Sequence, residues 1–339
     1  MNNQQWAPSA TIQTWRARQG LIEQIRSFFM ERAVLEVDVP TLSQAIGTDP
    51  HLDFYETRFE IGGAPHISSE SGLRRFLTTS PEFHLKRLLA AGFPDIFYLG
   101  KAFRNGEAGD RHNGEFTILE WYRIGWDWDQ LMEEVLNLCA ILAQKSNSPA
   151  ATLARKPVRK ITWQNAYKVH CGFDPLDSSL SEIENCAERL GLSPFPGASR
   201  EDWLDLLMGT VIETKLGRQG PEFLTHYPPA QAALAQIEEM PDGTHWARRF
   251  ELYWDGIELC NGYQELCDPM EQRQRFEQDI QHRELLGKVN PVLDMHFLAA
   301  LEQGLPACSG VALGIDRLAM LLLGKNTIRD VLLFPDARA

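Results

Sequence analysis

The feature that most restricts the fold of this chain is the Asp255-Gly256 pair, which separates two runs of alternating apolar and polar residues, 249–254 and 257–261. Asp-Gly between such runs is a strong signal for a β-hairpin with a two-residue turn, because these residues tolerate the positive φ angles that the turn requires. A turn of this length pairs Tyr253 with Glu258 across the two strands. An antiparallel hairpin is therefore expected.

Two glutamates lie on one face of this hairpin. Side chains alternate along a strand, so Glu251 shares the face of Tyr253, and Glu258 joins them from the opposite strand. The two carboxylates are then diagonal neighbours, roughly 7 Å apart at the backbone. Paired carboxylates on a buried face repel each other, and a hard divalent ion such as magnesium removes that repulsion while it holds substrate phosphates. The alternative is a solvated sheet face with two ordinary glutamates.

The continuation of the second strand carries three further polar residues, Asn261, Tyr263 and Glu265. They have the opposite parity from Glu258, so a site that uses both sets requires a bulge or a break. We predict it near Gly262, because glycine is suited to such an irregularity. Glu265 has apolar and aromatic neighbours, which suits a carboxylate that recognises an amine of a ligand. An exposed strand end explains Glu265 equally well.

The rest of the chain alternates helices with strands in an order typical of an α+β fold. Apolar spacing and capping residues predict helices over residues 14–33, 80–92, 268–286 and 317–323, and strands over 34–37, 95–104, 115–123 and 309–315. Ser80 is expected to cap the second helix, with Pro81 as its first residue. Residues 145–222 are expected to form a helical insertion within a single domain that spans residues 1–339.

A polar loop, residues 105–114, separates two of these strands and is long for a hairpin, which favours a role in binding. Arg104 before the loop offers a permanently charged fork for a phosphate, and His112 and Asn113 offer hydrogen-bond donors. Phe116 after the loop can stack on a nucleobase. Taken singly, a strand-end arginine is also a common surface residue, and Phe116 is also a common core residue.

Arg317 opens a helix, where the helix dipole disfavours a positive charge. The position therefore requires a nearby anion, which is either the neighbouring Asp316 or a bound phosphate. Both explanations stay open at this point.

Composition excludes several classes of protein. The formal net charge is −13, which disfavours a dedicated nucleic-acid binder. The longest apolar stretches, such as 318–323, are far shorter than a membrane span, and the N-terminus has no signal-peptide pattern, so we expect a cytoplasmic protein without a membrane partner. The six cysteines show no C-x-x-C spacing and are expected to be small, buried apolar residues.

Three segments, in order, resemble the signature motifs of the class II aminoacyl-tRNA synthetases, and of their lysyl-tRNA synthetase group in particular. The segments are Arg32-Ala-Val-Leu-Glu-Val-Asp-Val-Pro40, then Phe103-Arg104-Asn105 with Arg111-His-Asn-Gly-Glu-Phe-Thr117 and Glu120-Trp-Tyr122, and last Gly310-Val-Ala-Leu-Gly-Ile-Asp-Arg317. The match spans nearly the whole chain. It implies an antiparallel sheet flanked by helices, a homodimer built around residues 20–40, and formation of an aminoacyl adenylate from ATP with Mg²⁺.

The resemblance also implies roles for individual residues, with Arg104 and Arg317 as the catalytic pair that contacts the phosphates. The ATP-binding residues that it implies are Arg104, Asn105, Gly106, His112, Asn113, Phe116, Glu258, Leu259, Gly314 and Arg317. For the metal it implies Glu251 and Glu258. For the amino acid it implies Ser80, Pro81, Glu82, Glu120, Tyr122, Asn261, Tyr263, Glu265 and Ala312, with carboxylates for two ammonium groups.

Departures from the synthetase pattern indicate which group within this family the chain resembles. The first motif lies close to Met1, so we expect no anticodon-binding domain and no transfer RNA as the acceptor. This shortened form resembles the elongation factor P lysine ligases, which implies activation of (R)-β-lysine, or lysine, and its transfer to a lysine side chain of elongation factor P. Ser80 replaces a usual alanine, and Ala312 replaces a glycine of the third motif. The added methyl group at Ala312 crowds an α-amino acid and favours a displaced β-amino group.

One position departs from both families. The motif that normally reads Arg-Asn-Glu reads Arg104-Asn105-Gly106, with Glu107 one residue later. Either the Glu107 side chain or the backbone of Gly106 replaces the missing carboxylate.

Three other functions fit the sequence: a tRNA-aminoacylating fragment of a lysyl-tRNA synthetase, an amide-forming enzyme of the asparagine synthetase A kind, and a non-catalytic paralogue that binds and regulates. Amino-acid-dependent exchange of pyrophosphate into ATP separates the regulator from the enzymes. The acyl acceptor then separates the enzymes from one another.

Overall fold

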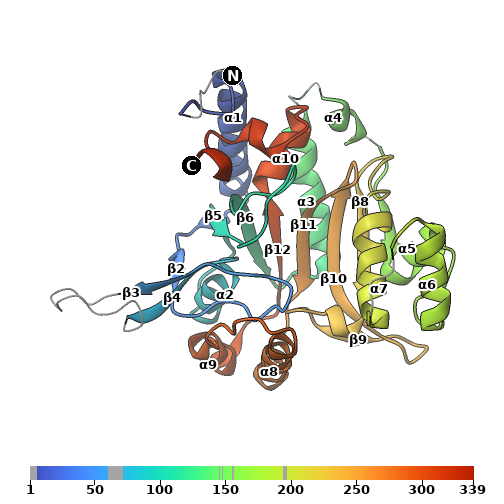
Figure 1. Cartoon of the computed structure of the whole chain (residues 1–339). Helices are drawn as coiled ribbons and strands as arrows, with labels where there is room; N and C mark the ends of the chain where they lie inside the picture. The colour runs from blue at the N-terminus through green and yellow to red at the C-terminus, as the bar shows by residue number, and fades with distance from the viewer. Residues whose placement is uncertain (1–5, 60–71, 145, 147, 155, 194–196) are drawn as a thin grey trace.

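A nine-stranded, mainly antiparallel sheet runs through the centre of the molecule (Figure 1). The computed structural model describes residues 6–59, 72–144, 146, 148–154, 156–193 and 197–339. In spatial order the strands are β1 (Leu35–Glu36), β5 (Ile96–Phe103), β6 (Glu115–Ile124), β12 (Cys308–Gly314), β11 (Ile257–Gln264), β10 (His245–Trp254), β8 (Glu222–Tyr227) and β7 (Arg159–Thr162), and β9 (Ile237–Glu239) pairs with β10. The outer pairs β1–β5 and β8–β7 are parallel, and the pairs between them are antiparallel. A second, small sheet contains β2 (Leu42–Ser43), β4 (Leu73–Leu77) and β3 (Glu56–Phe59).

Helices cover both faces of the large sheet. One face packs against α1 (Ile12–Met30), α3 (Trp128–Ala143) and α10 (Ile315–Leu322), around a core that includes Trp121 and Leu313. On the other face, α2 (Glu82–Ala90), α8 (Pro269–Leu285) and α9 (Met295–Gly304) pack near β5 and β6. α5 (Trp163–His170), α6 (Leu180–Arg189) and α7 (Arg200–Leu207) pack near β8 and β10. The two helix groups on this second face lie at opposite ends of the sheet (Figure 1).

The main elements predicted from sequence are confirmed, with shifted ends. The predicted helix 14–33 is α1, which begins at Ile12 because the Thr11 hydroxyl accepts the Thr14 N–H at 3.1 Å and so caps the helix. The predicted hairpin is formed by β10 and β11, with Tyr253 opposite Glu258. The α+β fold class, with an antiparallel sheet flanked by helices, is confirmed as well.

A β-bulge interrupts the hairpin close to its turn. The register shifts between Leu252 and Tyr253, so that Tyr253 faces Glu258 whereas Leu252 faces Cys260. Leu259 is therefore the extra residue on β11, and it is buried. A bulge adds one residue to one strand, so it reverses the side-chain alternation beyond it.

Gly262 has a different role from the predicted one. A Cβ atom at this position would overlap the Phe250 ring on the adjacent strand, so glycine permits close packing here rather than a bulge. The prediction of a bulge near Gly262 is therefore wrong. The bulge at Leu259 nevertheless has the predicted effect, because Glu258 and Asn261 both line one cavity.

α2 begins at Glu82 rather than at Pro81. Pro81 takes the cap position without a side-chain hydrogen bond, so the prediction of Ser80 as the cap is wrong. The Ser80 hydroxyl still accepts the Glu82 N–H at 3.1 Å, and it donates to Glu120 in the cavity described below. The serine therefore joins the start of this helix to the sheet.

The segment predicted as a helical insertion, 145–222, contains a strand as well. Its regular elements are α4 (Pro149–Leu153), β7, α5, α6, α7 and one π-helical turn (Met208–Ile212). The sequence does not predict β7, because its four residues show no run of buried apolar side chains and pair with β8 from the edge of the sheet. Short 3-10 helices elsewhere are Pro229–Gln231, Ile328–Val331 and Asp336–Arg338. The extent of the insertion as a unit of its own stays a prediction.

None of the helices in the described part of the chain is long and apolar enough to cross a membrane. The six cysteines are free, and all are buried except Cys267, which is half-buried. This agrees with their predicted role as small apolar residues.

Candidate active site

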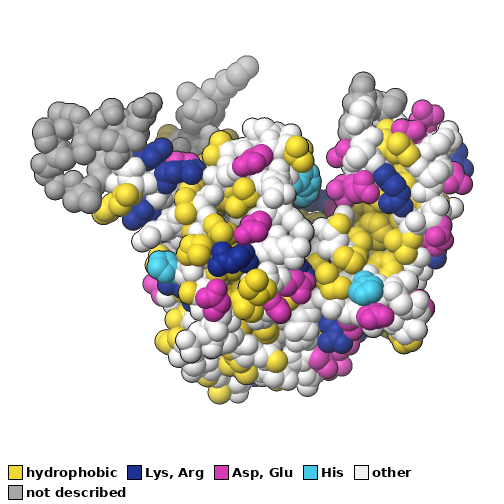
Figure 2. Space-filling model, turned by 90° about the horizontal axis from the view of Figure 1, so that it is seen from below, with side chains coloured by type: hydrophobic (Ala, Val, Ile, Leu, Met, Phe, Trp, Pro, Cys, Tyr) yellow, Lys and Arg dark blue, Asp and Glu magenta, His cyan; other side chains and the backbone are white. Residues whose placement is uncertain are grey.

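A cavity of about 1360 Å³ lies over β6, β12, β11 and β10, between α2 and α8 on one side and α7 on the other. Figure 2 views the molecule from below, where the surface is hollowed between the central part and the lobe at the right. The predicted site residues that line the cavity are Ser80, Glu82, Arg104, His112, Asn113, Phe116, Glu120, Tyr122, Glu251, Glu258, Leu259, Asn261, Tyr263, Glu265, Ala312, Gly314 and Arg317. Pro81, Asn105 and Gly106 lie outside its lining. The fold thus brings segments that are far apart in the sequence to one site.

Glu120 forms the floor of one end of the cavity, where it is 2% exposed. Its two carboxylate oxygens accept hydrogen bonds from the Ser80 hydroxyl at 2.7 Å and the Tyr122 hydroxyl at 2.8 Å. Burial, together with the nearby charge of Glu82, raises the pKa of Glu120 to about 8, and the two hydroxyl donors oppose that rise. This carboxylate is ready to lose a proton when a cation binds beside it.

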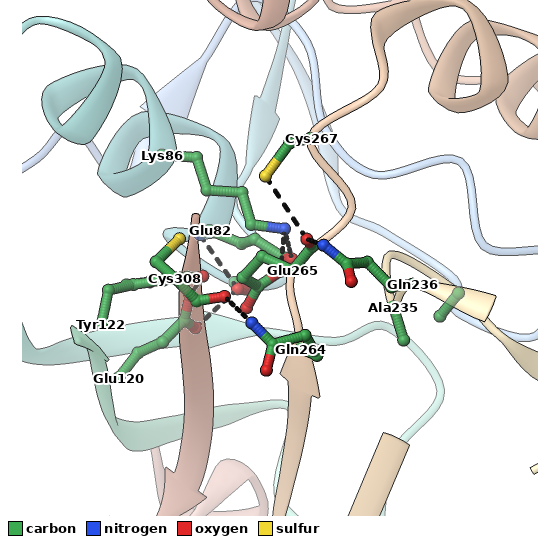
Figure 3. A network of polar contacts seen from close by, with 12 residues as sticks. Glu82, Lys86, Glu120, Tyr122, Ala235, Gln236, Gln264, Glu265, Cys267 and Cys308 are labelled. Atoms are coloured by element: carbon green, nitrogen blue, oxygen red, sulfur yellow. Dashed lines mark hydrogen bonds and ion pairs between the residues drawn. The ribbon is translucent and has the colours of Figure 1, made fainter. Parts of the chain in front are cut away.

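A lysine that the sequence analysis missed, Lys86, lies behind this end of the cavity (Figure 3). Its Nζ is 2.6 Å from Glu82 Oε1 and 2.5 Å from Glu265 Oε2. Burial opposes the charge of Lys86, but the two carboxylates outweigh burial, so the pKa of Lys86 lies above its ordinary value. Lys86 follows Glu82 by four residues on a predicted helix, and this spacing is a signal that an ion pair can form.

Glu265 is completely buried and is not the exposed strand end that its position also allowed. Burial raises the pKa of Glu265, and the Lys86 ammonium group holds part of that rise back. Together with Glu82 and Glu120, it gives this end of the cavity three carboxylates. Such a site suits a ligand with more than one ammonium group.

Arg249, which sequence reasoning also missed, connects two predicted site residues. Its Nη2 is 2.6 Å from Glu251 Oε1, and its Nε donates to Asn261 Oδ1 at 3.3 Å. The Tyr253 hydroxyl donates to the other Glu251 oxygen at 2.8 Å. The guanidinium group also stacks on Tyr227, 4.2 Å from the ring centroid. These contacts fix the orientation of Glu251 on the cavity floor.

Arg317 pairs with an anion on the neighbouring strand, Glu258 of β11. Its Nη1 donates to Glu258 Oε2 at 3.1 Å, and its Nη2 lies 2.6 Å from His112 Nε2. Burial and the charge of Arg317 lower the pKa of His112, so the neutral imidazole can accept this hydrogen bond. The explanation that Arg317 pairs with Asp316 is wrong, because Asp316 forms its ion pair with Arg18 at 2.7 Å.

Asp316 instead joins three elements next to the cavity. One oxygen pairs with Arg18 of α1, and the other accepts the Thr117 N–H of β6 at 2.7 Å. Arg18 also donates to the Thr117 hydroxyl at 2.9 Å. Thr117 follows Phe116 and Asp316 precedes Arg317, so this buried network holds both residues in place.

Arg104 and Phe116 lie together, with the guanidinium carbon 5.1 Å from the ring centroid. Glu107 also lines the cavity and is 3.5 Å from Arg104 Nη1, whereas Gly106 lies outside the lining with a φ of 80°. The Glu107 side chain therefore reaches the cavity beside Arg104, whereas Gly106 does not.

The Asn113 side chain is engaged by the C-terminal segment. It donates to Asp336 Oδ1 at 3.1 Å and to the Glu115 carbonyl at 2.8 Å, and it accepts the Asp336 N–H at 3.0 Å. Asp336 Oδ2 accepts the Gly114 N–H at 2.8 Å. These bonds hold the loop 105–114 against the end of the chain.

The carboxylates of Glu251 and Glu258 are suitable ligands for a magnesium ion, which binds oxygen donors. Both line the cavity from one face of the hairpin, and each carboxylate has a positively charged partner, Arg249 for Glu251 and Arg317 for Glu258. The described residues contain no cluster of three or more histidine, cysteine or acidic side chains that could enclose a metal. Magnesium commonly takes one or two carboxylates and completes its shell with phosphate oxygens and water.

Comparisons with known proteins agree with this geometry. The family model of the class II tRNA synthetases (D, K and N) matches residues 6–338. A protein of Vibrio vulnificus is 45% identical over 332 residues, which cover 97% of this chain and 98% of that protein. A Vibrio cholerae protein is 45% identical over the full length of both chains, and a Yersinia enterocolitica protein is 44% identical over 98% of each. All three relatives are named elongation factor P-(R)-β-lysine ligase.

Proposed function

Since this chain belongs to the class II tRNA synthetase family, as one of its elongation factor P-(R)-β-lysine ligases, we propose that it activates (R)-β-lysine with ATP and transfers it to a lysine side chain of elongation factor P. The observation that carries the proposal is the group of three buried or half-buried carboxylates, Glu82, Glu120 and Glu265, at one end of the cavity. They match the two ammonium groups of a diamino acid. A translation factor as acceptor places the reaction in the cytoplasm.

Catalysis in this proposal is positioning and electrostatic stabilisation. The amino-acid carboxylate attacks the α-phosphorus of ATP, and the bond to the bridging oxygen breaks as pyrophosphate leaves. Arg104 and Arg317 stabilise the phosphates, and Phe116 stacks on the base beside His112. Arg317 exchanges its contact with Glu258 for a phosphate oxygen. Magnesium, held by Glu251 and Glu258, would supply charge neutralisation on the phosphates.

The second half-reaction forms an amide. The uncharged ε-amine of the acceptor lysine attacks the carbonyl carbon of the adenylate, and AMP leaves. The reaction requires no nucleophile from the ligase. The acceptor amine must lose one proton before it attacks, so the site must favour its uncharged form or supply a base, and the second proton leaves the nitrogen as the amide forms.

Ala312 lies between two residues of the amino-acid end. On the sheet it pairs with Glu120 of β6 on one side and Asn261 of β11 on the other, and it lines the cavity. Its methyl group therefore occupies space between the groups proposed to hold the substrate. This supports a preference for an amino acid whose amino group is displaced by one carbon.

Exchange of pyrophosphate into ATP, measured with (R)-β-lysine and with α-lysine, tests the proposal. We expect (R)-β-lysine to have the higher kcat/KM, and Ala312→Gly to shift the ratio toward α-lysine by about 10-fold or more, the usual effect of one methyl group in a pocket. Ala102→Gly, which removes a buried methyl group of β5 outside the cavity, is the control and leaves the ratio unchanged. Equal rates with both amino acids, or none with either, contradict the proposal.

We further propose a two-fold homodimer around residues 20–40. β1 is an edge strand of the large sheet; its Leu35 is 46% exposed, and Met30 at the end of α1 is 72% exposed. A self-complementary apolar patch of this kind is typical of two-fold interfaces.

Light scattering at micromolar concentration is expected to give the mass of a dimer. Leu35→Lys is expected to shift the protein toward the monomer, because it places a charge on each side of the interface. The control is Leu176→Lys, which changes a leucine that is 45% exposed elsewhere on the surface, and it is expected to leave the mass unchanged. A monomer in the unmodified protein rules the interface out.

A further inference from the structure

We propose that Lys86 is a positioning residue that favours the charged form of the Glu265 carboxylate and holds it directed at the amino-acid end of the cavity, so that Glu265 can accept an ammonium group of the substrate. The inference rests on the proposed function for the identity of that substrate, a diamino acid. Lys86 itself is fully buried and is absent from the cavity lining, so it acts through its partners.

The contacts of Lys86 show how it can do this (Figure 3). Its side chain leaves α2 and places Nζ 2.5 Å from Glu265 and 2.6 Å from Glu82. The ammonium group lies 5.9 Å from the Phe297 ring centroid, which gives it an apolar wall. One lysine thus joins a residue of α2 and the residue that follows β11, and both of these line the cavity.

Glu265 depends on this ion pair. Neither of its buried oxygens forms a well-aligned hydrogen bond. The positive charge of Lys86, 2.5 Å from Oε2, lies next to them. A buried carboxylate without a nearby cation binds a proton, and a protonated carboxyl group is a poor acceptor for an ammonium group. Lys86 therefore determines whether Glu265 can recognise a cation.

The charges at this end of the cavity agree with that role. Once a cation binds and Glu120 has lost its proton, Glu82, Glu120 and Glu265 carry three formal negative charges and Lys86 carries one positive charge, which leaves two negative charges for a substrate with two ammonium groups. Further titratable groups near Glu265 are uncharged at neutral pH, because burial raises the pKa values of Tyr122, Tyr263, Cys267 and Cys308. Lys86 thus sets the net charge of this end of the cavity at a value that matches a ligand with two positive charges.

Replacing Lys86 with methionine preserves an unbranched side chain but removes the charge. Glu82 and Glu265 then repel each other, and the pair takes up a proton at neutral pH. A cation must expel that proton before it binds. The defect is therefore large at low pH and shrinks as the pH rises, which a packing defect alone does not explain.

The test is calorimetric binding of 1,4-diaminobutane, which has the amine spacing of β-lysine, and of butylamine, between pH 6.5 and 8.5. We expect the wild-type protein to prefer the diamine, and Lys86→Met to weaken diamine binding by about 30-fold at the lowest pH, within the range for the removal of charged hydrogen bonds. The gap should narrow as the pH rises.

Two controls keep the test decisive. Lys101→Met removes a lysine that is 44% exposed and paired with Glu115 on β5 and β6, and it leaves binding unchanged. Lys86→Gln provides a second neutral variant of different shape, which shows the same pH trend if Lys86→Met does not fold. ATP binding is expected to change less than about 2-fold in each variant, because the ion pairs of Lys86 lie at the amino-acid end of the cavity.

The outcomes separate this inference from the proposed function. A gap that is equal at every pH, or a wild-type protein that does not prefer the diamine, overturns the role of Lys86. A wild-type protein that binds the diamine as described but shows no exchange of pyrophosphate with (R)-β-lysine supports the role of Lys86 and refutes the proposed substrate.

Discussion

Glu251→Gln and Glu258→Gln are each expected to lower amino-acid-dependent exchange of pyrophosphate into ATP by about 100-fold or more, the effect of removing one preorganised group from a charged transition state. Both carboxylates line the cavity from one face of the hairpin. Glutamine keeps the shape of each side chain but removes the negative charge that magnesium requires. Glu258→Gln also removes the negative charge that pairs with Arg317 at 3.1 Å.

The matched control is Glu239→Gln, which changes an exposed glutamate on β9, the strand beside β10. It is expected to exchange pyrophosphate at the native rate. Folding of the two test variants can be followed by thermal unfolding, since the opposite face of the hairpin, with Leu252 and Trp254, carries the core. Native exchange rates in both Glu251→Gln and Glu258→Gln would show that the metal assignment is wrong.

Gly310→Ala is expected to remove amino-acid-dependent activity almost completely, with a decrease of about 100-fold or more. A Cβ atom at this position would overlap both the Tyr122 ring and a carboxylate oxygen of Glu265. Both side chains are buried, so neither can move aside without cost. Overpacking of this kind destabilises a protein by about 1–3 kcal/mol and shifts the surrounding groups. The displaced groups are those proposed to hold the substrate.

Gly20→Ala is the control for this change. Gly20 lies within α1, and a Cβ atom there would have nothing within 4 Å. The exchange of glycine for alanine in a helix stabilises it by about 0.5–1 kcal/mol. We therefore expect Gly20→Ala to have native activity and a slightly higher Tm. Gly310→Ala with native KM for the amino acid would contradict the arrangement of Tyr122 and Glu265 described above.

Local features of the sequence predicted the hairpin well and its bulge poorly. The pairing of Tyr253 with Glu258 follows from the Asp255-Gly256 turn alone, and the structure confirms it. The position of the bulge depends on contacts beyond the strand, because Leu259 packs into the core that α10 and α3 complete. A glycine suggests where a strand can bend, but Gly262 serves packing against Phe250 instead.

The sequence did not reveal the residues that hold the site in place through contacts between distant segments. Asp336 holds Asn113 and Gly114 from the other end of the chain, and Arg18 holds Asp316 from the first helix. No periodicity or spacing within one sequence indicates such pairs. Lys86 differs from them, because half of its ion-pair network, the contact with Glu82, is local.

The central claim is that the acyl acceptor is a lysine of elongation factor P, and mass spectrometry of the intact factor tests it most directly. After incubation with the ligase, ATP and (R)-β-lysine, we expect the mass of the factor to increase by one β-lysyl group on one lysine. Omission of ATP should abolish the change, and α-lysine should give less product. An unchanged mass of elongation factor P, together with efficient charging of lysine tRNA by the same preparation, would contradict the claim and identify a synthetase instead.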